Sequence, residues 1–207
     1  MEVRIVSCGI FQLELARVLE EIKAEWASAD DFKVTYLTPA LHVDLNKLKD
    51  GITESLNMVT EEKIVLFYGS MCHPELSEFT KKYHVIRPQP RNCIELVLGK
   101  ERQKELEGSD RVFYLTPGWL QNWQNIFGQG LGWDEIDARQ NFGFYDKILL
   151  LDTGVCEFND EDILEFYEYT QVPIEIASVQ LVVFKEHVAE ILKRVLGKKA
   201  STDISNC

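Results

Sequence analysis

Three of the five cysteines follow short apolar runs that predict β-strands. Cys8 follows the run 3–7, Cys72 follows 63–69, and Cys93 lies in the loop after 84–87. Because parallel strands end at the same edge of a sheet, we expect the three thiols to face one site. Thiolates bind soft and borderline metals, and three of them with an open fourth position suit catalytic zinc. An iron–sulfur cluster with one iron that no cysteine binds is the alternative.

Other residues near these strand ends are candidates for the same site. His73, next to Cys72, or His42 is a candidate fourth ligand, and water or an exogenous thiol would serve the same purpose. Tyr68 and Trp119 are the candidate cofactor-binding residues, and no residue is assigned a catalytic role. Cys93 opens a predicted helix, where we expect the helix dipole to lower the pKa of its thiol.

A structural role is the competing interpretation for each of these side chains. Free cysteine is among the most buried residue types, so any single one is compatible with core packing. No CxxC pair is present, and the spacing alone therefore does not identify a metal site. Cys156 lies in an acidic loop and Cys207 near the C-terminus, and we interpret both as incidental.

Aromatic residues are dense between residues 119 and 145. Trp119, Trp123 and Phe127 follow helical spacing, which favours core packing; a flat cofactor or a partner surface is the alternative. Glycines at 128, 130 and 132 predict a loop that would act as a lid over the strand ends. The chain has no GxGxxG, GxxxxGK[ST] or GxSxG motif, so nucleotide binding and the common hydrolase arrangement have no support.

Strands and helices alternate along the chain. Strands are expected over 3–7, 32–37, 63–69, 84–87, 111–116, 147–154 and 173–179. Helices are expected over 12–26, 41–59, 93–108, 119–128, 160–170 and 182–196. This alternation predicts an α/β fold with a mostly parallel, Rossmann-like sheet of about seven strands and helices on both faces. We expect one α/β domain over 1–198 and a frayed C-terminal tail over 199–207.

Composition excludes several classes of protein. With 207 residues, 45% of them hydrophobic, the chain can bury enough apolar surface to fold. Its net charge of −12 argues against a nucleic-acid binder, and it has no apolar run of about 18 residues that would span a membrane. An odd number of widely spaced cysteines without a secretory signal predicts a cytoplasmic protein with reduced thiols.

Five segments resemble the domain of unknown function 1638 family, in the family's order. They are CGIF (8–11), YGSMCHPEL (68–76), PRNCIELVLG (90–99), LTPGWLQNW (115–123) and LLLDTG (149–154). The resemblance implies a cytosolic α/β protein in which Cys8, Cys72 and Cys93 match cysteines of the family. Such proteins are often encoded beside corrinoid-dependent methyltransferases in anaerobes, which links them by association to methyl transfer, methanogenesis or corrinoid handling.

The sequence therefore leaves three hypotheses. The first is a zinc protein of corrinoid-linked methyl metabolism, in which zinc on Cys8, Cys72 and Cys93 activates a thiol for methyl transfer. The second is an iron–sulfur protein that uses the same cysteines. The third is a non-catalytic accessory protein that binds a corrinoid protein or methyltransferase through the segment from Trp119 to Trp133. The sequence does not decide whether the chain forms a homo-oligomer.

Overall fold

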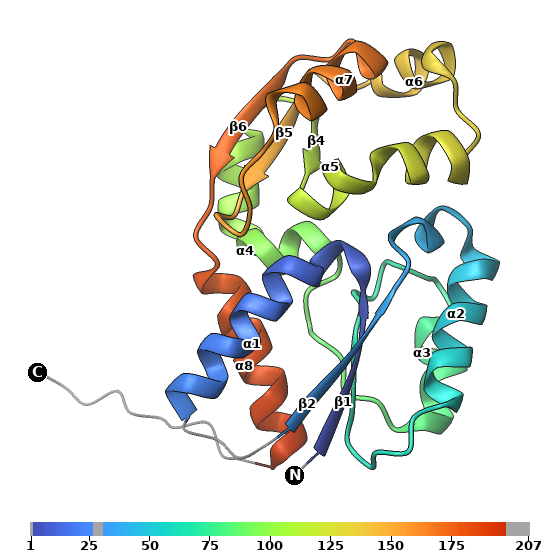
Figure 1. Ribbon diagram of the computed structural model, residues 1–207, viewed down its shortest axis with the longest axis vertical. Helices are drawn as coiled ribbons and strands as arrows, with labels where there is room; N and C mark the ends of the chain where they lie inside the picture. Colours follow the sequence, from blue (N-terminus) through green and yellow to red (C-terminus); the bar gives the residue numbers. More distant parts are fainter. Residues whose placement is uncertain (1, 27–30, 198–207) are drawn as a thin grey trace, which may run out of the picture.

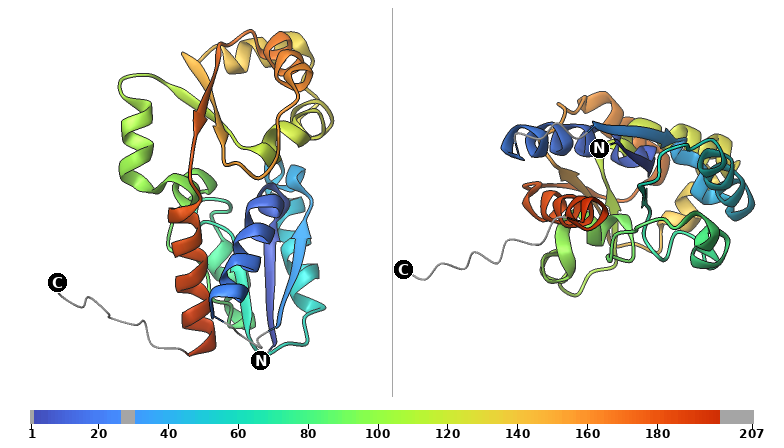
Figure 2. Two further views of the ribbon diagram at one scale, coloured as in Figure 1. Left: turned by 60° about the vertical axis from the view of Figure 1, so that its left-hand side comes forward. Right: turned by 90° about the horizontal axis from the view of Figure 1, so that it is seen from below.

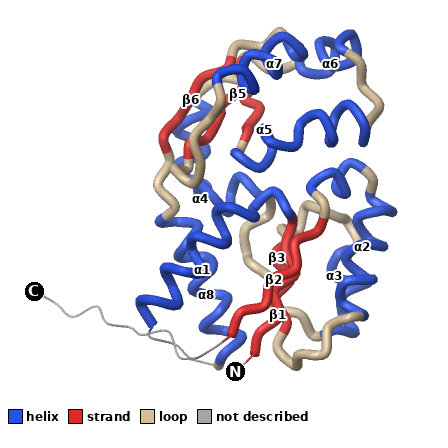
Figure 3. The backbone as a smooth tube through the Cα atoms, viewed as in Figure 1, coloured by secondary structure: helices blue, strands red, loops and turns tan. Residues whose placement is uncertain are grey.

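Two separate sheets of three parallel strands form the framework of the chain (Figure 1, Figure 3). The structure, a computed structural model, describes residues 2–26 and 31–197. One sheet has the strand order β2-β1-β3 and the other β4-β5-β6, with every neighbouring pair parallel. The α/β class with parallel strands is thus confirmed. The expected single sheet of about seven strands is wrong, because β3 and β4 do not pair.

The lower sheet in Figure 1 is buried on both faces. It consists of β1 (Glu2–Cys8), β2 (Asp31–Leu37) and β3 (Ile64–Phe67). Alternate residues point to opposite faces. One face packs against α1 (Gln12–Trp26) and α8 (Val182–Leu196), and the other against α2 (Leu45–Asn57) and α3 (Leu76–Thr80).

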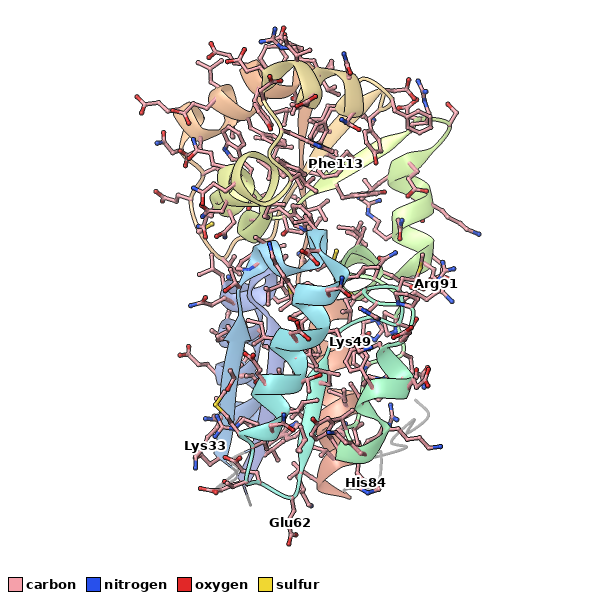
Figure 4. The ribbon with its side chains drawn as sticks, turned by 90° about the vertical axis from the view of Figure 1, so that its right-hand side faces the viewer. Lys33, Lys49, Glu62, His84, Arg91 and Phe113 are labelled. Carbon is pink, nitrogen blue, oxygen red and sulfur yellow. The ribbon has the colours of Figure 1, made fainter. Side chains whose placement is uncertain are left out.

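The upper sheet carries most of the aromatic residues. It consists of β4 (Val112–Leu115), β5 (Lys147–Asp152) and β6 (Ile174–Ser178). Its helices are α5 (Pro117–Trp123), the π-helical segment Gln124–Gly130, α6 (Glu135–Phe142) and α7 (Asp160–Thr170). Phe113, labelled in this half in Figure 4, meets the rings of Phe142 and Tyr145 edge to face. This aromatic cluster is the core of the upper half.

The loop expected around glycines 128, 130 and 132 is wrong up to Gly130, because the chain is π-helical there, whereas Gly132 lies outside the helix and the lid stays a prediction. The chain continues from α5 into Gln124–Gly130, where Ile126 and Phe127 are buried in the upper core. The sequence also did not predict α6. This helix is capped by Asp134, whose carboxylate accepts hydrogen bonds from the backbone N–H groups of Ile136 and Asp137.

The segment between the two sheets contains no full strand. The expected strand 84–87 forms a single bridge, between Ile86 and Val65. His84 just before it has φ of 53°, and Pro88 just after it has no N–H to continue a ladder. The chain then enters α4 (Cys93–Glu107), which is interrupted by the non-helical backbone of Gly99.

One hydrophobic cluster runs through both halves of the molecule. It joins Ile5 of the lower sheet and Phe184 of α8 to Leu149 and Leu151 of the upper sheet. Figure 2 shows α8 alongside the lower sheet and directly below the upper half. The single domain over 1–198 stays a prediction, and the tail over 199–207 lies outside the described residues. None of the described helices is long and apolar enough to cross a membrane.

Candidate functional site

A cavity of about 270 Å³ lies between the carboxyl ends of the lower strands and helix α5. Cys8 borders it from the end of β1, Cys72 from the loop after β3, and Cys93 from the first position of α4. The structure thus brings together the three cysteines that the sequence singles out. The two candidate cofactor-binding residues, Tyr68 and Trp119, also line the cavity.

The strand order explains why a cavity forms at this place. From β1 the chain crosses to β2 on one side, and from β2 it returns across β1 to β3 on the other side. The chain packs α1 on one face of the sheet after β1 and α3 on the other face after β3, and a crevice opens between the carboxyl ends of the two strands. Cys8 and the loop 68–72 lie at this crevice.

Two glycines allow the walls of the cavity to come close together. A Cβ at Gly69 would lie 2.2 Å from the carbonyl oxygen of Arg91, so only glycine lets the loop of Cys72 touch the start of α4. A Cβ at Gly118 would lie 2.1 Å from the carbonyl oxygen of Ile10, so only glycine lets α5 touch the turn after Cys8. Both contacts join segments that are far apart in the sequence.

Two hydrogen bonds fix the start of α4. Asn92 Oδ1 accepts from the N–H of Glu95 at 2.9 Å, and Glu95 Oε2 accepts from the N–H of Arg91 at 2.6 Å. The buried carboxylate of Glu95 also lies 3.4 Å from Lys100 Nζ. Burial opposes ionisation, but the hydrogen bonds from Arg91 and Lys100 lower the pKa of Glu95 below its usual value. Cys93 is thereby held at a defined position on the wall.

Burial makes the three thiols weak acids. It raises the pKa of Cys8 and of Cys93 to about 12, and it also raises the pKa of Cys72. The negative charge of a neighbouring thiolate adds to the rise for Cys8 and Cys93. The expectation that the helix dipole lowers the pKa of Cys93 is therefore wrong, because desolvation outweighs the N–H groups at the start of α4.

The Tyr68 hydroxyl is a buried polar group without a hydrogen-bond partner among the described residues. It lies against the thiol of Cys8 and near that of Cys72. Burial raises the pKa of Tyr68 well above its usual value, so the phenol keeps its proton. The floor of the site thus has one O–H donor that meets no described acceptor in good hydrogen-bond geometry, with the Cys8 thiol as its neighbour.

The remaining wall of the cavity is apolar and well packed. Phe11 and Phe67 line it, and both rings contact Phe184 of α8, with centroids 5.4 and 5.6 Å away. Leu45 and Met71 also line it, with 46% and 65% of their surface exposed, which places them toward its mouth. The surroundings of the thiols are therefore largely apolar, with exposed side chains at the edge of the cavity.

Trp119 lines the cavity from the upper half. Its ring stacks on Phe127, with centroids 5.7 Å apart and planes at 25°. Trp119 and Phe127 thus pack in the upper core, as their helical spacing favours. The indole of Trp119 in addition forms part of the cavity wall.

His73 does not border the cavity. It is 5% exposed, its Nδ1 accepts a hydrogen bond from the N–H of Glu75 at 3.0 Å, and its ring packs edge to face against Phe79. Its role as the fourth ligand stays a prediction, and only Nε2 is available for it in this arrangement. The side chain of His42 and residue Cys207 lie outside the described part of the chain.

The sulfur atoms do not converge on a single point. Within residues 2–26 and 31–197, no three His, Cys, Asp or Glu side chains are arranged as a group that would hold a metal ion. Cys8, Cys72, Cys93 and Cys156 are free thiols. The three cavity cysteines therefore surround a space, each from its own wall, instead of clustering at one position.

Comparison with known proteins identifies the family but no function. No curated protein sequence matches the chain. A sugar transporter from Clostridium phytofermentans matches with 9% identity and a TM-score of 0.41, covering 96% of this chain and 94% of that one. The Escherichia coli transcriptional repressor ascG matches with 8% identity and a TM-score of 0.40, covering 96% and 93%. Likeness at this level carries no argument about function. The chain belongs to the family described as protein of unknown function, DUF1638, whose sequence profile matches residues 36–188 and so includes Cys72 and Cys93.

Proposed function

We propose that Cys8, Cys72 and Cys93 bind a soft metal in the cavity between the two halves, with zinc as the first candidate. The observation that carries the proposal is that three free thiols, from three separate segments, border one apolar cavity at the crevice of a parallel sheet. Soft and borderline metals prefer such sulfur ligands. The Rossmann-like winding of the lower sheet, β2-β1-β3, supports the choice of this crevice.

The donor set suits a soft metal by its chemistry, although the thiols would have to move to reach one ion. Rotation of one cysteine between staggered χ1 positions moves its Sγ by about 3 Å, and the proposal requires rotations of this kind to bring the sulfur atoms to a common ion. The unpartnered Tyr68 hydroxyl supports the fit, because a buried O–H donor next to a sulfur would be satisfied once that sulfur is a thiolate.

Bound zinc would supply a Lewis acid that lowers the pKa of a substrate thiol. The chain itself would provide the three thiolates, and the apolar walls formed by Phe11, Phe67 and Trp119 would exclude water from the reacting sulfur. The exposed edge beside Leu45 and Met71 would admit the substrate. The link to corrinoid-dependent methyl transfer, with a corrinoid protein or methyltransferase as partner, comes from the family resemblance and is part of the proposal.

The arrangement also favours a second candidate, an iron–sulfur cluster on the same three cysteines. A cluster fills a volume and takes its ligands at several irons, whereas zinc needs all sulfur atoms about 2.3 Å from one point. The three thiols surround a cavity of about 270 Å³ without converging on one point. This arrangement matches the ligand arrangement of a cluster more directly than that of a single zinc ion.

Metal and sulfide content after anaerobic purification tests the proposal. We expect close to one zinc per chain, or iron with acid-labile sulfide and a brown colour that dithionite bleaches. Cys72→Ala should lose the metal, whereas Cys156→Ala, which changes a free thiol outside the cavity lining, should keep it. Less than about 0.2 metal per wild-type chain after reconstitution, or equal metal in both variants, would refute the proposal.

A further inference from the structure

The cavity that the three cysteines border has a lining without charge. Among the residues that the structure describes, no Asp, Glu, Lys, Arg or His side chain lines it. Two larger cavities differ in this respect. One of about 420 Å³ is lined in part by Arg17 and Lys185, and one of about 610 Å³ in part by Lys100 and Arg102. A charged ligand in the cysteine cavity would lose its water shell without meeting an opposite charge, which lowers affinity.

The thiols and the start of α4 do not change this. Burial raises the pKa of Cys8 and Cys93 to about 12 and that of Cys72 above its usual value, so the three thiols are uncharged near neutral pH. The first turn of a helix carries a partial positive charge. In α4 the buried carboxylate of Glu95 lies in that turn, held by the N–H of Arg91 at 2.6 Å. This carboxylate offsets the partial charge, so the helix start does not by itself favour an anion.

Aromatic rings from three segments form walls of the cavity. Phe11 follows β1, Phe67 ends β3, and Trp119 lies in α5. The rings of Phe11 and Phe67 meet edge to face with centroids 5.7 Å apart, and Trp119 stacks on Phe127, so packing fixes all three rings. Aromatic rings held in place in this way favour edge-to-face or offset contacts with a further ring. The thioether of Met71, which also lines the cavity, makes favourable contacts with aromatic rings as well.

The size of the cavity limits what it can hold. A dry apolar cavity of about 150 Å³ holds benzene, and this cavity has about 270 Å³. Ligand pockets usually have about 300–1,000 Å³, so this one is small for a ligand site. It has room for one ring with a short substituent, which would enter at the exposed edge beside Leu45 and Met71.

We propose that the cavity binds a small uncharged aromatic molecule, made of one ring with a short substituent. The inference goes beyond the proposed metal site and does not rest on it, because it needs only the cavity and its walls. The uncharged lining, the three packed aromatic rings and the volume of about 270 Å³ carry it together. An aliphatic ring of the same size would lack the ring–ring contacts, which contribute about 2- to 10-fold in affinity.

Binding of 4-fluoroacetophenone to the reduced, metal-free full chain, followed by ¹⁹F NMR, tests this inference. The probe is an uncharged substituted ring, and 4-fluorobenzoate is a charged counterpart of nearly the same shape. We expect the ketone to bind saturably and the benzoate to bind at least about 100-fold more weakly, since it brings an unpaired charge to an uncharged lining. Unlabelled acetophenone should displace the probe at about 2- to 10-fold lower concentration than cyclohexyl methyl ketone.

Two further readouts locate the bound probe. Cys72→Met places a longer side chain at the cavity and should weaken binding about tenfold. Cys156→Met, the matched control at a free thiol outside the lining, should not. In the wild-type chain, probe at about ten times its dissociation constant should slow alkylation of Cys72 by N-ethylmaleimide about tenfold and leave Cys156 unaffected. The alkylation readout does not depend on the folding of a variant.

Each way in which the inference can fail gives a distinct result. Absence of saturable binding of 4-fluoroacetophenone overturns it, and so does equal affinity for 4-fluorobenzoate. If bound probe does not protect Cys72 in the wild-type chain, the probe lies elsewhere and the inference is refuted. Equal displacement by the two unlabelled ketones would show that the cavity does not select aromatic rings, and this also overturns it. The metal content that tests the proposed function is measured separately, so either proposal can fail without the other.

Discussion

The close contact at Gly69 holds the loop of Cys72 against the start of α4, so Gly69→Ala should disturb the site and the fold together. A Cβ there would lie 2.2 Å from the carbonyl oxygen of Arg91 and 2.6 Å from its carbonyl carbon. Since ordinary contacts begin near 3.4 Å, one backbone must retreat by about 1 Å. The N–H of Met71 donates to the same carbonyl oxygen at 2.9 Å, and this hydrogen bond would be lost in the retreat.

The expected cost follows from these contacts. Forcing extra atoms into a packed region costs about 1–3 kcal/mol, and the lost hydrogen bond adds about 0.5–1.5 kcal/mol. Alanine restricts the unfolded chain and returns about 0.4–1 kcal/mol. We therefore expect Gly69→Ala to lower the free energy of unfolding by about 2 kcal/mol, which corresponds to roughly 2–4 °C in melting temperature per kcal/mol.

Urea unfolding followed by circular dichroism measures this loss. Gly128→Ala is the matched control, because a Cβ at this helical position meets nothing within 4 Å. It should leave stability unchanged or raise it by up to about 1 kcal/mol. The reasoning is refuted if Gly69→Ala unfolds at the wild-type midpoint, or if Gly128→Ala loses as much stability as Gly69→Ala.

Three further outcomes follow from other contacts and charges. In Gly118→Ala a Cβ would lie 2.1 Å from the carbonyl oxygen of Ile10, so urea unfolding should show a similar loss of about 2 kcal/mol; an unchanged midpoint contradicts this. Burial raises the pKa of Cys8 and Cys93 from 9.0 to about 12. At pH 8 iodoacetamide should therefore alkylate both cysteines about a thousandfold more slowly in the folded, metal-free chain than in urea. Peptide mass spectrometry measures the two rates, and equal rates would contradict the raised pKa values. Burial also raises the pKa of Glu14 above 4.5, so as the pH rises the unfolded chain loses this proton first and stability falls, by up to about 1.4 kcal/mol per pH unit between the two pKa values. Glu14→Gln should remove this fall, and a variant that keeps the wild-type pH profile of unfolding would argue against the explanation.

Long amphipathic helices were predictable from the sequence. The helices α1, α7 and α8 have the bounds that their apolar spacing predicts. Local signals mark their ends: Asn159 caps the start of α7, and Gly197 closes α8 with φ of 68°. Such signals lie within a few residues of each other along the chain, so they can be read without knowledge of the tertiary structure.

The pairing of the strands could not be predicted in the same way. A continuous apolar run shows that a strand is buried on both faces, but it does not show which strand lies beside it. Here α8 and α4 contribute side chains such as Phe184 and Leu96 to the cluster that also receives Leu149 and Leu151 of the upper sheet. The two sheets are therefore joined through helix side chains in this shared cluster and not through pairing of β3 with β4.

The grouping of the cysteines was predictable from their positions after strands, but the closure of the cavity was not. Closure depends on Gly69 and Gly118, whose partners Arg91 and Ile10 are distant in the sequence. The motif LTPGW shows a glycine between a helix-starting proline and an aromatic residue, which indicates a close contact. It does not show which segment makes that contact. The acidity of Cys93 was misjudged for the same reason, since the burial that decides it comes from other parts of the chain.

The raised pKa values of the three cavity cysteines bear on which chemical roles their thiols can have. A nucleophilic cysteine needs a pKa lowered toward neutrality by positive charges, and Cys8, Cys72 and Cys93 show the opposite. A cysteine of the inert core would be enclosed by packed side chains, whereas each of these borders a cavity with an open mouth. A metal cation can replace the three protons and supply the positive charge that the cavity wall does not contain. The three thiols thus have neither the lowered pKa of nucleophiles nor full enclosure by side chains, and the proposed metal site depends on the cavity that they share.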